Sequence, residues 1–148
     1  MSATAWLAVA ASALLAVVWT LRARYVVVTV TGDSMLPSLR QGDRVLVRRR
    51  RLSNADVGQV IVLAGPGAAS SGWIVKRLTA MPGQPVPPGS LPASMPSGGH
   101  VPPGALIVVG DNAEVSYDSR QAGFFAADRV LGVVVRRLAR PESHVGDL

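Results

Sequence analysis

The feature that limits this chain most is an uncharged apolar run at its N-terminus. Residues 3–21, ATAWLAVAASALLAVVWTL, contain no Asp, Glu, Lys or Arg. A helix over this run is about 28 Å long at about 1.5 Å per residue, close to the thickness of a bilayer core. Trp6 and Trp19 lie near its two ends, where aromatic side chains favour the membrane interface. The run predicts one transmembrane helix, and we expect residues 1–24 to form a membrane anchor.

A cleaved secretory signal is the alternative interpretation of this run. Such a signal has a basic segment before the apolar run and a small-x-small cleavage site after it. Here no Lys or Arg precedes the run, and TLRARY follows it, which favours an uncleaved anchor. Arg22 and Arg24 would by the positive-inside rule put the rest of the chain in the cytoplasm. The rule weakens where a whole folded domain follows, so charge alone leaves the orientation open.

The pattern after residue 24 is that of short strands. Runs rich in β-branched residues alternate with Gly, Pro, Asp and Asn, and no amphipathic helical period of useful length follows. The expected strands cover residues 25–31, 44–48, 59–64, 73–80, 105–110 and 131–138. They predict an all-β fold, a compact antiparallel β-sheet domain over residues 25–148. Residues 81–104 are rich in Pro and Gly and predict a long, exposed and mobile loop within that domain.

Composition narrows the chemistry. The chain has no cysteine, which excludes disulfides, thiolate metal sites and a Cys nucleophile. Neither His100 nor His144 has a ligand-like neighbour, so we expect no metal and no cofactor. The net charge of +6 favours an anionic partner. No basic stretch is interleaved with aromatic residues, so we do not expect a nucleic acid.

The basic run Arg48 to Arg51 has two interpretations. It is either a solvated turn or a contact with anionic lipid headgroups, the latter worth about 1 kcal/mol per residue near the surface.

Lys76 is the one lysine in a chain that otherwise uses arginine. Side chains two apart share a face of a strand, so Ile74, Lys76 and Leu78 point to one side, which we expect to be the core side. Burial lowers the pKa of an amine, by up to about 3–5 units for a fully buried group. A neutral amine accepts a proton from a serine, whereas a guanidinium stays protonated. The position therefore suggests a general base, and a snorkelling lysine at a strand edge is the plainer alternative.

Two polar stretches complete the candidate chemistry. In TGDSMLPSL (31–39), Ser34 follows the end of a strand, where a serine on a tight turn can present its hydroxyl and its own N–H to one point. In GDNAEVSYDSR (110–120), Asp118 and Arg120 can pair, and Ser116 can hydrogen-bond a nearby amine. Taken alone, each stretch is more often an ordinary turn or a solvated loop.

Together, in this order and behind an anchor, the three stretches resemble the bacterial type I signal peptidases, the membrane-bound Ser/Lys peptidases of family S26. The resemblance covers nearly the whole chain, through GDSMLPSL, KRLTAMPGQ and GDNAEVSYDSR, with VPPGALIVVGDN and RVLGVVV also following the pattern. It implies Ser34 as the nucleophile and Lys76 as the general base. It further implies that Ser116 holds the lysine amine while Asp118 and Arg120 brace the site.

The resemblance also implies a substrate and a location. The expected partners are membrane lipids and precursor proteins with signal peptides, cleaved after small residues in an Ala-x-Ala pattern on the extracytoplasmic side of a bacterial membrane. Gly32 stands where some members have a helping serine, so the oxyanion hole would rest mainly on the Ser34 backbone N–H. An extended substrate would add as a strand between residues 26–31 and 72–76. The residues expected to contact it are Thr31, Gly32, Asp33, Met35, Ile74 and Val75.

Three other functions compete with a general signal peptidase. A dedicated peptidase that matures one or a few precursors would have the same site. A self-cleaving repressor of the SOS type shares a Ser/Lys pair but should begin with a DNA-binding domain, where this chain has an apolar run. A non-catalytic, membrane-tethered β module would tolerate Ser34→Ala without loss of function.

Overall fold

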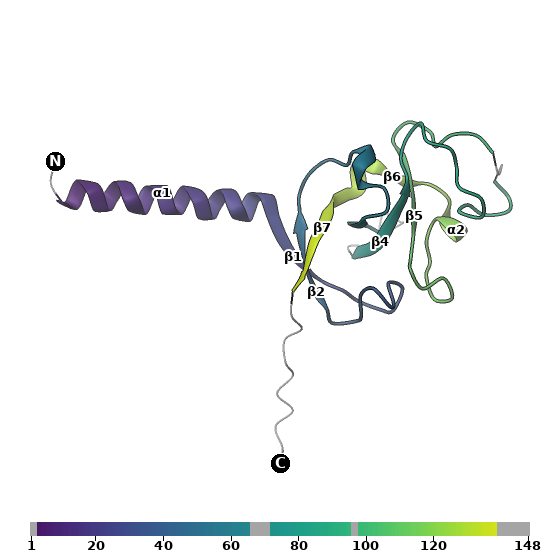
Figure 1. Cartoon of the computed structure of the whole chain (residues 1–148), viewed down its shortest axis with the longest axis horizontal. Coiled ribbons are helices and arrows are strands. Elements are labelled where there is room, and N and C mark those ends of the chain that lie inside the picture. The colour runs from purple at the N-terminus through teal and green to yellow at the C-terminus, as the bar shows by residue number, and fades with distance from the viewer. Residues whose placement is uncertain (1–2, 66–71, 96–97, 139–148) are drawn as a thin grey trace, which may run out of the picture.

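One long helix precedes the sheet domain. The structure, a computed structural model, describes residues 3–65, 72–95 and 98–138. Helix α1 (Ala3–Arg24) projects away from the β-domain, and no part of its apolar window is buried in the protein (Figure 1). Its window has a mean hydropathy of 1.9, so it is long and apolar enough to cross a membrane. The observed helix continues beyond the apolar run through Arg24.

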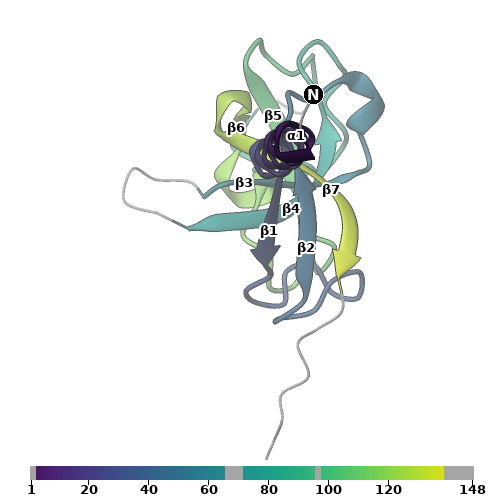
Figure 2. The ribbon, with the colours of Figure 1, turned by 90° about the vertical axis from the view of Figure 1, so that its left-hand side faces the viewer.

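The domain is built on a single antiparallel sheet, which confirms the all-β fold. Its strands are β1 (Tyr25–Thr29), β2 (Arg44–Arg48), β3 (Val60–Ala64), β4 (Trp73–Ala80), β5 (Ala105–Val109), β6 (Phe125–Ala126) and β7 (Val130–Leu138). Their spatial order is β1-β2-β7-β3-β4-β5-β6, and β1, β2 and β7 lie side by side behind the end of α1 (Figure 2). All six expected strands are present, with bounds that differ by at most two residues.

Three short helical elements and β6 carried no clear sequence signal. The helical elements are the α-helix α2 (Ser119–Ala122) and the 3-10 helices η1 (Asn54–Asp56) and η2 (Ala127–Arg129). Each is three or four residues long, too short for a helical period to be visible.

The core lies on both faces of the sheet. Val75 belongs to one cluster of buried side chains, with Met35, Val45, Val47 and Val62. Leu78 belongs to the other, with Ile61, Leu63, Leu106 and Val108. Burying an aliphatic side chain of this size stabilises the fold by about 1.5–3 kcal/mol. Alternation along β4 thus sends neighbouring residues into different clusters.

Two strand edges of the sheet are unpaired within the described residues. Strand β1 pairs only with β2, so its other edge is free within the described part of the chain. Strand β4 pairs with β3 through residues 73–77, but its pairing with β5 starts only at Arg77. The first half of β4 therefore also leaves an unpaired edge.

The Pro- and Gly-rich segment 81–104 is packed more closely than expected. The Gly83 N–H donates to the Val101 carbonyl, and the Val101 N–H donates to the Gln84 carbonyl, both at 2.8 Å. Pro85 bridges to His100. Val101 is 2% exposed and packs with Ala80 and Ile107. The expectation of an exposed loop is therefore wrong at its apolar positions, because these residues close one end of the core.

Candidate active site

Lys76 lies in the middle of β4 with its side chain buried. It is 4% exposed, and of its same-face neighbours Leu78 belongs to the second core cluster while the half-buried Ile74 packs against that cluster. The sequence alternation predicted this burial correctly. Burial lowers the pKa of the Lys76 amine from its usual value of 10.5. The charge of Asp118 raises this pKa and that of Arg120 lowers it, but both effects are smaller than that of burial.

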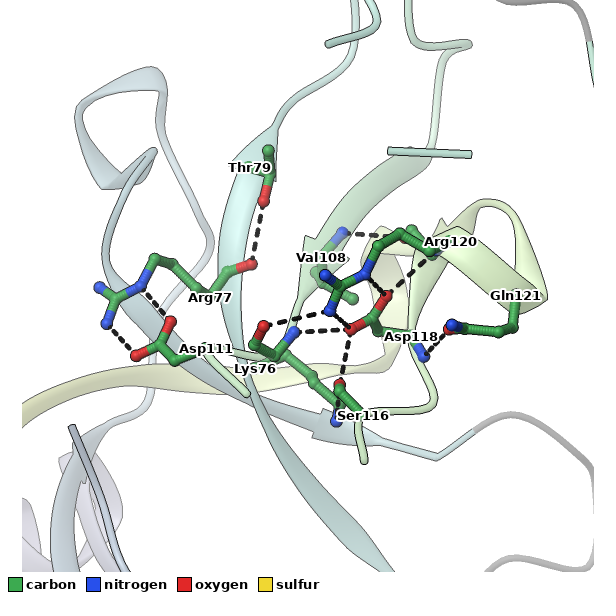
Figure 3. A network of polar contacts seen from close by, with 11 residues as sticks. Lys76, Arg77, Thr79, Val108, Asp111, Ser116, Asp118, Arg120 and Gln121 are labelled. Carbon is green, nitrogen blue, oxygen red and sulfur yellow. Dashed lines mark hydrogen bonds and ion pairs between the residues drawn. The ribbon is translucent and has the colours of Figure 1, made fainter. Parts of the chain in front are cut away.

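Ser116 links Lys76 to an acidic group. The Lys76 Nζ donates to the Ser116 Oγ at 2.9 Å, and the Ser116 hydroxyl donates to the Asp118 Oδ2 at 2.6 Å (Figure 3). A hydroxyl has one proton to donate. Because Asp118 receives that proton, the Ser116 oxygen can only accept from the amine. The amine is thereby held in one direction.

Asp118 is held as a carboxylate. Burial raises the pKa of Asp118. Hydrogen bonds from Arg120, the Gly110 N–H and Ser116 lower it by more in total, so the pKa falls from 3.8 to about 2. The Arg120 Nε and Nη2 atoms donate to its two oxygens at 2.9 and 2.6 Å. Asp118 also caps helix α2, because its side chain accepts from the Arg120 backbone N–H. A fully buried aspartate therefore keeps its charge and remains an acceptor for Ser116.

Ser34 lies in the turn that follows β1. The Val30 N–H donates to the Asp43 carbonyl at 2.8 Å, and the Gly42 N–H donates to the Val30 carbonyl, which closes the loop between β1 and β2. Met35, 1% exposed, fixes the turn to the core. Within the described residues the Ser34 N–H donates to no other group, so it is free for a ligand.

Gly110 brings the Ser34 turn and the Ser116 loop together. A Cβ at Gly110 would lie 2.1 Å from the Ser116 Oγ and 2.6 Å from the Ser34 carbonyl oxygen. The Asn112 N–H donates to that same carbonyl at 2.9 Å. Ser34 is thus close to the residue that holds Lys76. In the described part of the chain the Lys76 amine donates to Ser116 and makes no hydrogen bond to Ser34.

A second polar cluster beside the site carried no sequence signal. The Arg77 Nε donates to the Asp111 Oδ1 at 2.7 Å, and Ser38 also donates to Asp111. Arg77 follows Lys76, Asp111 follows Gly110, and Ser38 follows the Ser34 turn, so the cluster ties the three stretches together. Their spacing in the sequence gives no indication of this contact.

A cleft lies between β1 and the start of β4 and extends to Thr31, three residues before Ser34. It has a volume of about 410 Å³. Its lining residues are Val26, Val27, Val28, Thr29, Thr31, Arg49, Gly72, Trp73 and Leu131.

Among the expected substrate contacts, Thr31 lines the cleft and Ile74 is half-buried beside it, while Gly32 and Asp33 are exposed in the Ser34 turn. Met35 and Val75 are buried in the core, so their side chains support the cleft from below. Contact of all six residues with a substrate stays a prediction.

The basic run after β2 is not uniform. Arg50 forms an ion pair with Asp56, which is 2% exposed, and the guanidinium, by hydrogen bonding, holds the pKa of that carboxyl at about 2. Arg48, Arg49 and Arg51 are exposed. The interpretation of residues 48–51 as a solvated turn therefore does not describe Arg50, which is ion-paired to a buried carboxylate. Of the two histidines, His100 is exposed and His144 lies outside the described residues.

The structure thus shows a buried lysine, held by a serine, in an antiparallel β-domain behind one apolar helix, and comparison with known proteins gives the family of the chain. The family model described as "Signal peptidase, peptidase S26" matches residues 3–88 and 90–139, and the chain belongs to this family.

Individual relatives agree with that assignment. "Probable signal peptidase I-1" of Synechocystis sp. is 31% identical over 80% of this chain and 73% of the relative. "Signal peptidase IB" of Staphylococcus aureus is 27% identical over 72% of this chain and 73% of the relative.

Proposed function

We propose that this protein is a serine endopeptidase that removes signal peptides from exported precursors, with Ser34 as nucleophile and Lys76 as general base. Residues 1–24 act as the anchor and residues 25–148 as the catalytic domain. The observation that carries the proposal is the buried Lys76 amine, held by Ser116 next to the Ser34 turn.

The chemistry follows from the environment of the amine. A neutral Lys76 has a lone pair, and one of its N–H groups is used by Ser116, which leaves the lone pair for the Ser34 hydroxyl. Lys76 takes the Ser34 proton as Oγ attacks the scissile carbonyl carbon. The resulting ammonium returns this proton to the leaving amine, and an ester forms on Ser34. Water, deprotonated by Lys76, then cleaves the ester and frees Ser34.

The negative oxygen of the intermediate needs a donor. We propose the Ser34 N–H as this donor, because it has no other partner among the described residues. Such a donor is worth about 10²–10³ in kcat when it is removed from an oxyanion hole. Asp118 and Arg120 act as positioning residues, because in the described part of the chain their hydrogen bonds lead to the amine only through Ser116 and their charges have a smaller effect on its pKa than burial does.

The cleft fits an extended peptide. A strand between β1 and residues 73–76 of β4 would pair with both free edges, which would align the peptide next to Ser34. We propose precursors with small residues before the cleaved bond as substrates. Because exported precursors present that bond outside the cytoplasm, the catalytic domain lies on the extracytoplasmic side of a bacterial membrane.

The proposal is tested by incubating a panel of signal-peptide precursors with the full chain in detergent. We expect cleavage by the wild type, and none by Ser34→Ala, which should retain the wild-type thermal unfolding midpoint. Lys76→Arg should also be inactive, and its midpoint should fall, because it buries a guanidinium that cannot lose its charge. Cleavage of one or a few precursors would identify a dedicated peptidase. Equal activity in Ser34→Ala would refute the proposal, and binding without cleavage by the wild type would indicate a non-catalytic module.

A further inference from the structure

We propose that Arg49 forms a recognition site for the precursor segment about five to six residues before the cleaved bond and selects negative charge there, with Trp73 lining the cleft between this site and Ser34. The inference rests on the proposed function, because it concerns the far end of the same cleft. Both residues line the cleft, and Trp73 is 48% exposed.

The length of the cleft fixes which part of a substrate reaches Arg49. Along β1, the lining runs from Thr31, near Ser34, back to Val26. At about 3.3 Å per residue this distance is about 17 Å, which an extended peptide of the same rise covers with about five residues. A peptide with its scissile carbonyl at Ser34 therefore has its fifth or sixth preceding residue, approximately, beside Arg49.

The position of Arg49 is fixed at the membrane end of the domain. Its backbone N–H donates to the carbonyl of Arg24, the last residue of α1, at 2.8 Å. Gly132 of β7 lets this segment approach the sheet, because a Cβ there would lie 2.1 Å from the Arg48 carbonyl oxygen. Arg49 thus lies where a signal peptide leaves the bilayer and enters the cleft.

Among the described residues, no acidic residue lines the cleft to neutralise the positive charge of Arg49. All the other lining residues are uncharged, and within the described residues Arg49 forms no ion pair. Its neighbour Arg50 is paired with Asp56, and Arg22 and Arg24 add further positive charge at the end of α1. The potential at this mouth is therefore positive.

The chemistry that complements this mouth is an apolar helix that ends in exposed carbonyl groups. The last turn of a helix carries about half a negative charge on its unpaired carbonyl groups. A signal helix that unwinds about six residues before the cleaved bond would place this turn at Arg49. An acidic side chain there would also be favoured, and a Lys or Arg would be disfavoured.

The test uses three peptide substrates in neutral detergent that differ only about six residues before the bond, where they carry Glu, Gln or Lys. For the full-length wild type we expect kcat/KM to fall in the order Glu, Gln, Lys, with about tenfold between Glu and Lys. Changing Glu to Gln removes an attraction to Arg49, and changing Gln to Lys adds a repulsion, each of the size of an exposed charge pair. We expect Arg49→Gln to flatten the order and Arg49→Glu to reverse it. Arg51→Gln is the matched control, because Arg51 is exposed nearby but lies outside the cleft, and it should keep the wild-type order.

Two results would overturn the inference. One is the wild-type order in Arg49→Glu. The other is a fall in kcat/KM of Arg49→Gln that is equal for all three peptides and appears only in vesicles containing anionic phospholipid. That result would assign Arg49 to lipid headgroups. If the wild type cleaved none of the peptides and no precursor, the proposed function itself would fail.

Discussion

The Lys76 Nζ lies 2.9 Å from the Ser116 Oγ, and the amine is the donor of this hydrogen bond. Its direction is set two residues further along the chain, where Asp118 takes the only proton that Ser116 can give. A charged carboxylate thus fixes the orientation of an amine that it does not touch. Burial meanwhile lowers the pKa of that amine. Orientation by Ser116 and burial of the amine can be separated by mutation and by pH.

Removing the Ser116 hydroxyl should lower kcat. In Ser116→Ala the Lys76 amine loses its acceptor, so it spends less time aligned with Ser34. We expect kcat to fall by about 10²-fold, the lower end of the contribution of a general base, because the base is misplaced but still present. We expect KM to change little. Ser116→Thr, which keeps the hydroxyl, should recover part of this loss. Ser90→Ala is the control, because Ser90 is equally buried but bonds to the Pro87 carbonyl. Equal activity in Ser116→Ala and Ser90→Ala would remove Ser116 from the site.

Activity should rise with pH through the folded-state pKa of Lys76. This pKa lies below 10.5 because burial disfavours the ammonium, and only the neutral amine accepts the Ser34 proton. Measured kcat/KM from mildly acidic to alkaline pH should therefore climb and then level off. A flat profile would contradict an amine base.

The free energy of unfolding should also depend on pH through Lys76. Between the folded-state pKa and 10.5 the unfolded chain binds more protons at Lys76 than the folded one, so the free energy of unfolding should rise with pH there. Lys76→Met removes the titrating group and should lose this rise. If the rise persisted in Lys76→Met, the amine would not be its source.

Gly110→Ala should damage both the site and the fold. The new methyl group would lie 2.1 Å from the Ser116 Oγ and 2.6 Å from the Ser34 carbonyl, so one of the two segments must move. We expect the free energy of unfolding to fall by about 1–3 kcal/mol, as for overpacking, and kcat to fall more than stability alone explains. The control is Gly98→Ala, because Gly98 has open space at the same position. Normal turnover in Gly110→Ala would show that the two segments are not held as closely as described.

Asp118→Asn should remove an acid-sensitive contribution to stability. The pKa of Asp118 is about 2 in the fold, against 3.8 ordinarily, which corresponds to about 2 kcal/mol. This stability is present above the ordinary pKa and is lost as pH falls toward 2. Thermal unfolding in detergent should therefore show a gap between wild type and variant that narrows from about pH 4 downward. A constant gap would mean that the charge of Asp118 is not what stabilises the loop.

Much of the site can be predicted because its parts are local in the sequence. Alternation along one strand is enough to bury Lys76, and Asp118 and Arg120 lie close enough along the chain to pair. The helix could be predicted for the same reason, since an apolar run that spans a bilayer is a property of one segment.

The remaining features depend on contacts between distant segments. The contact of Arg77 with Asp111 and the approach of Ser34 to Gly110 both follow from the order of strands, which the short β-branched runs do not encode. The same holds for Val101, which looks like part of a loop until Ala80 and Ile107 are seen to cover it. Arg50 looks like one of four equal arginines, and its ion pair exists because η1 brings Asp56 beneath it.

The most direct test of the central claim is mass spectrometry of the full chain after acid quench of a reaction with a cleavable precursor peptide. The account predicts that the peptide containing Ser34 gains the mass of the acyl fragment upstream of the cleaved bond, and that Ser34→Ala gains none. An adduct on another residue, or cleavage by Ser34→Ala at the wild-type rate, would contradict it.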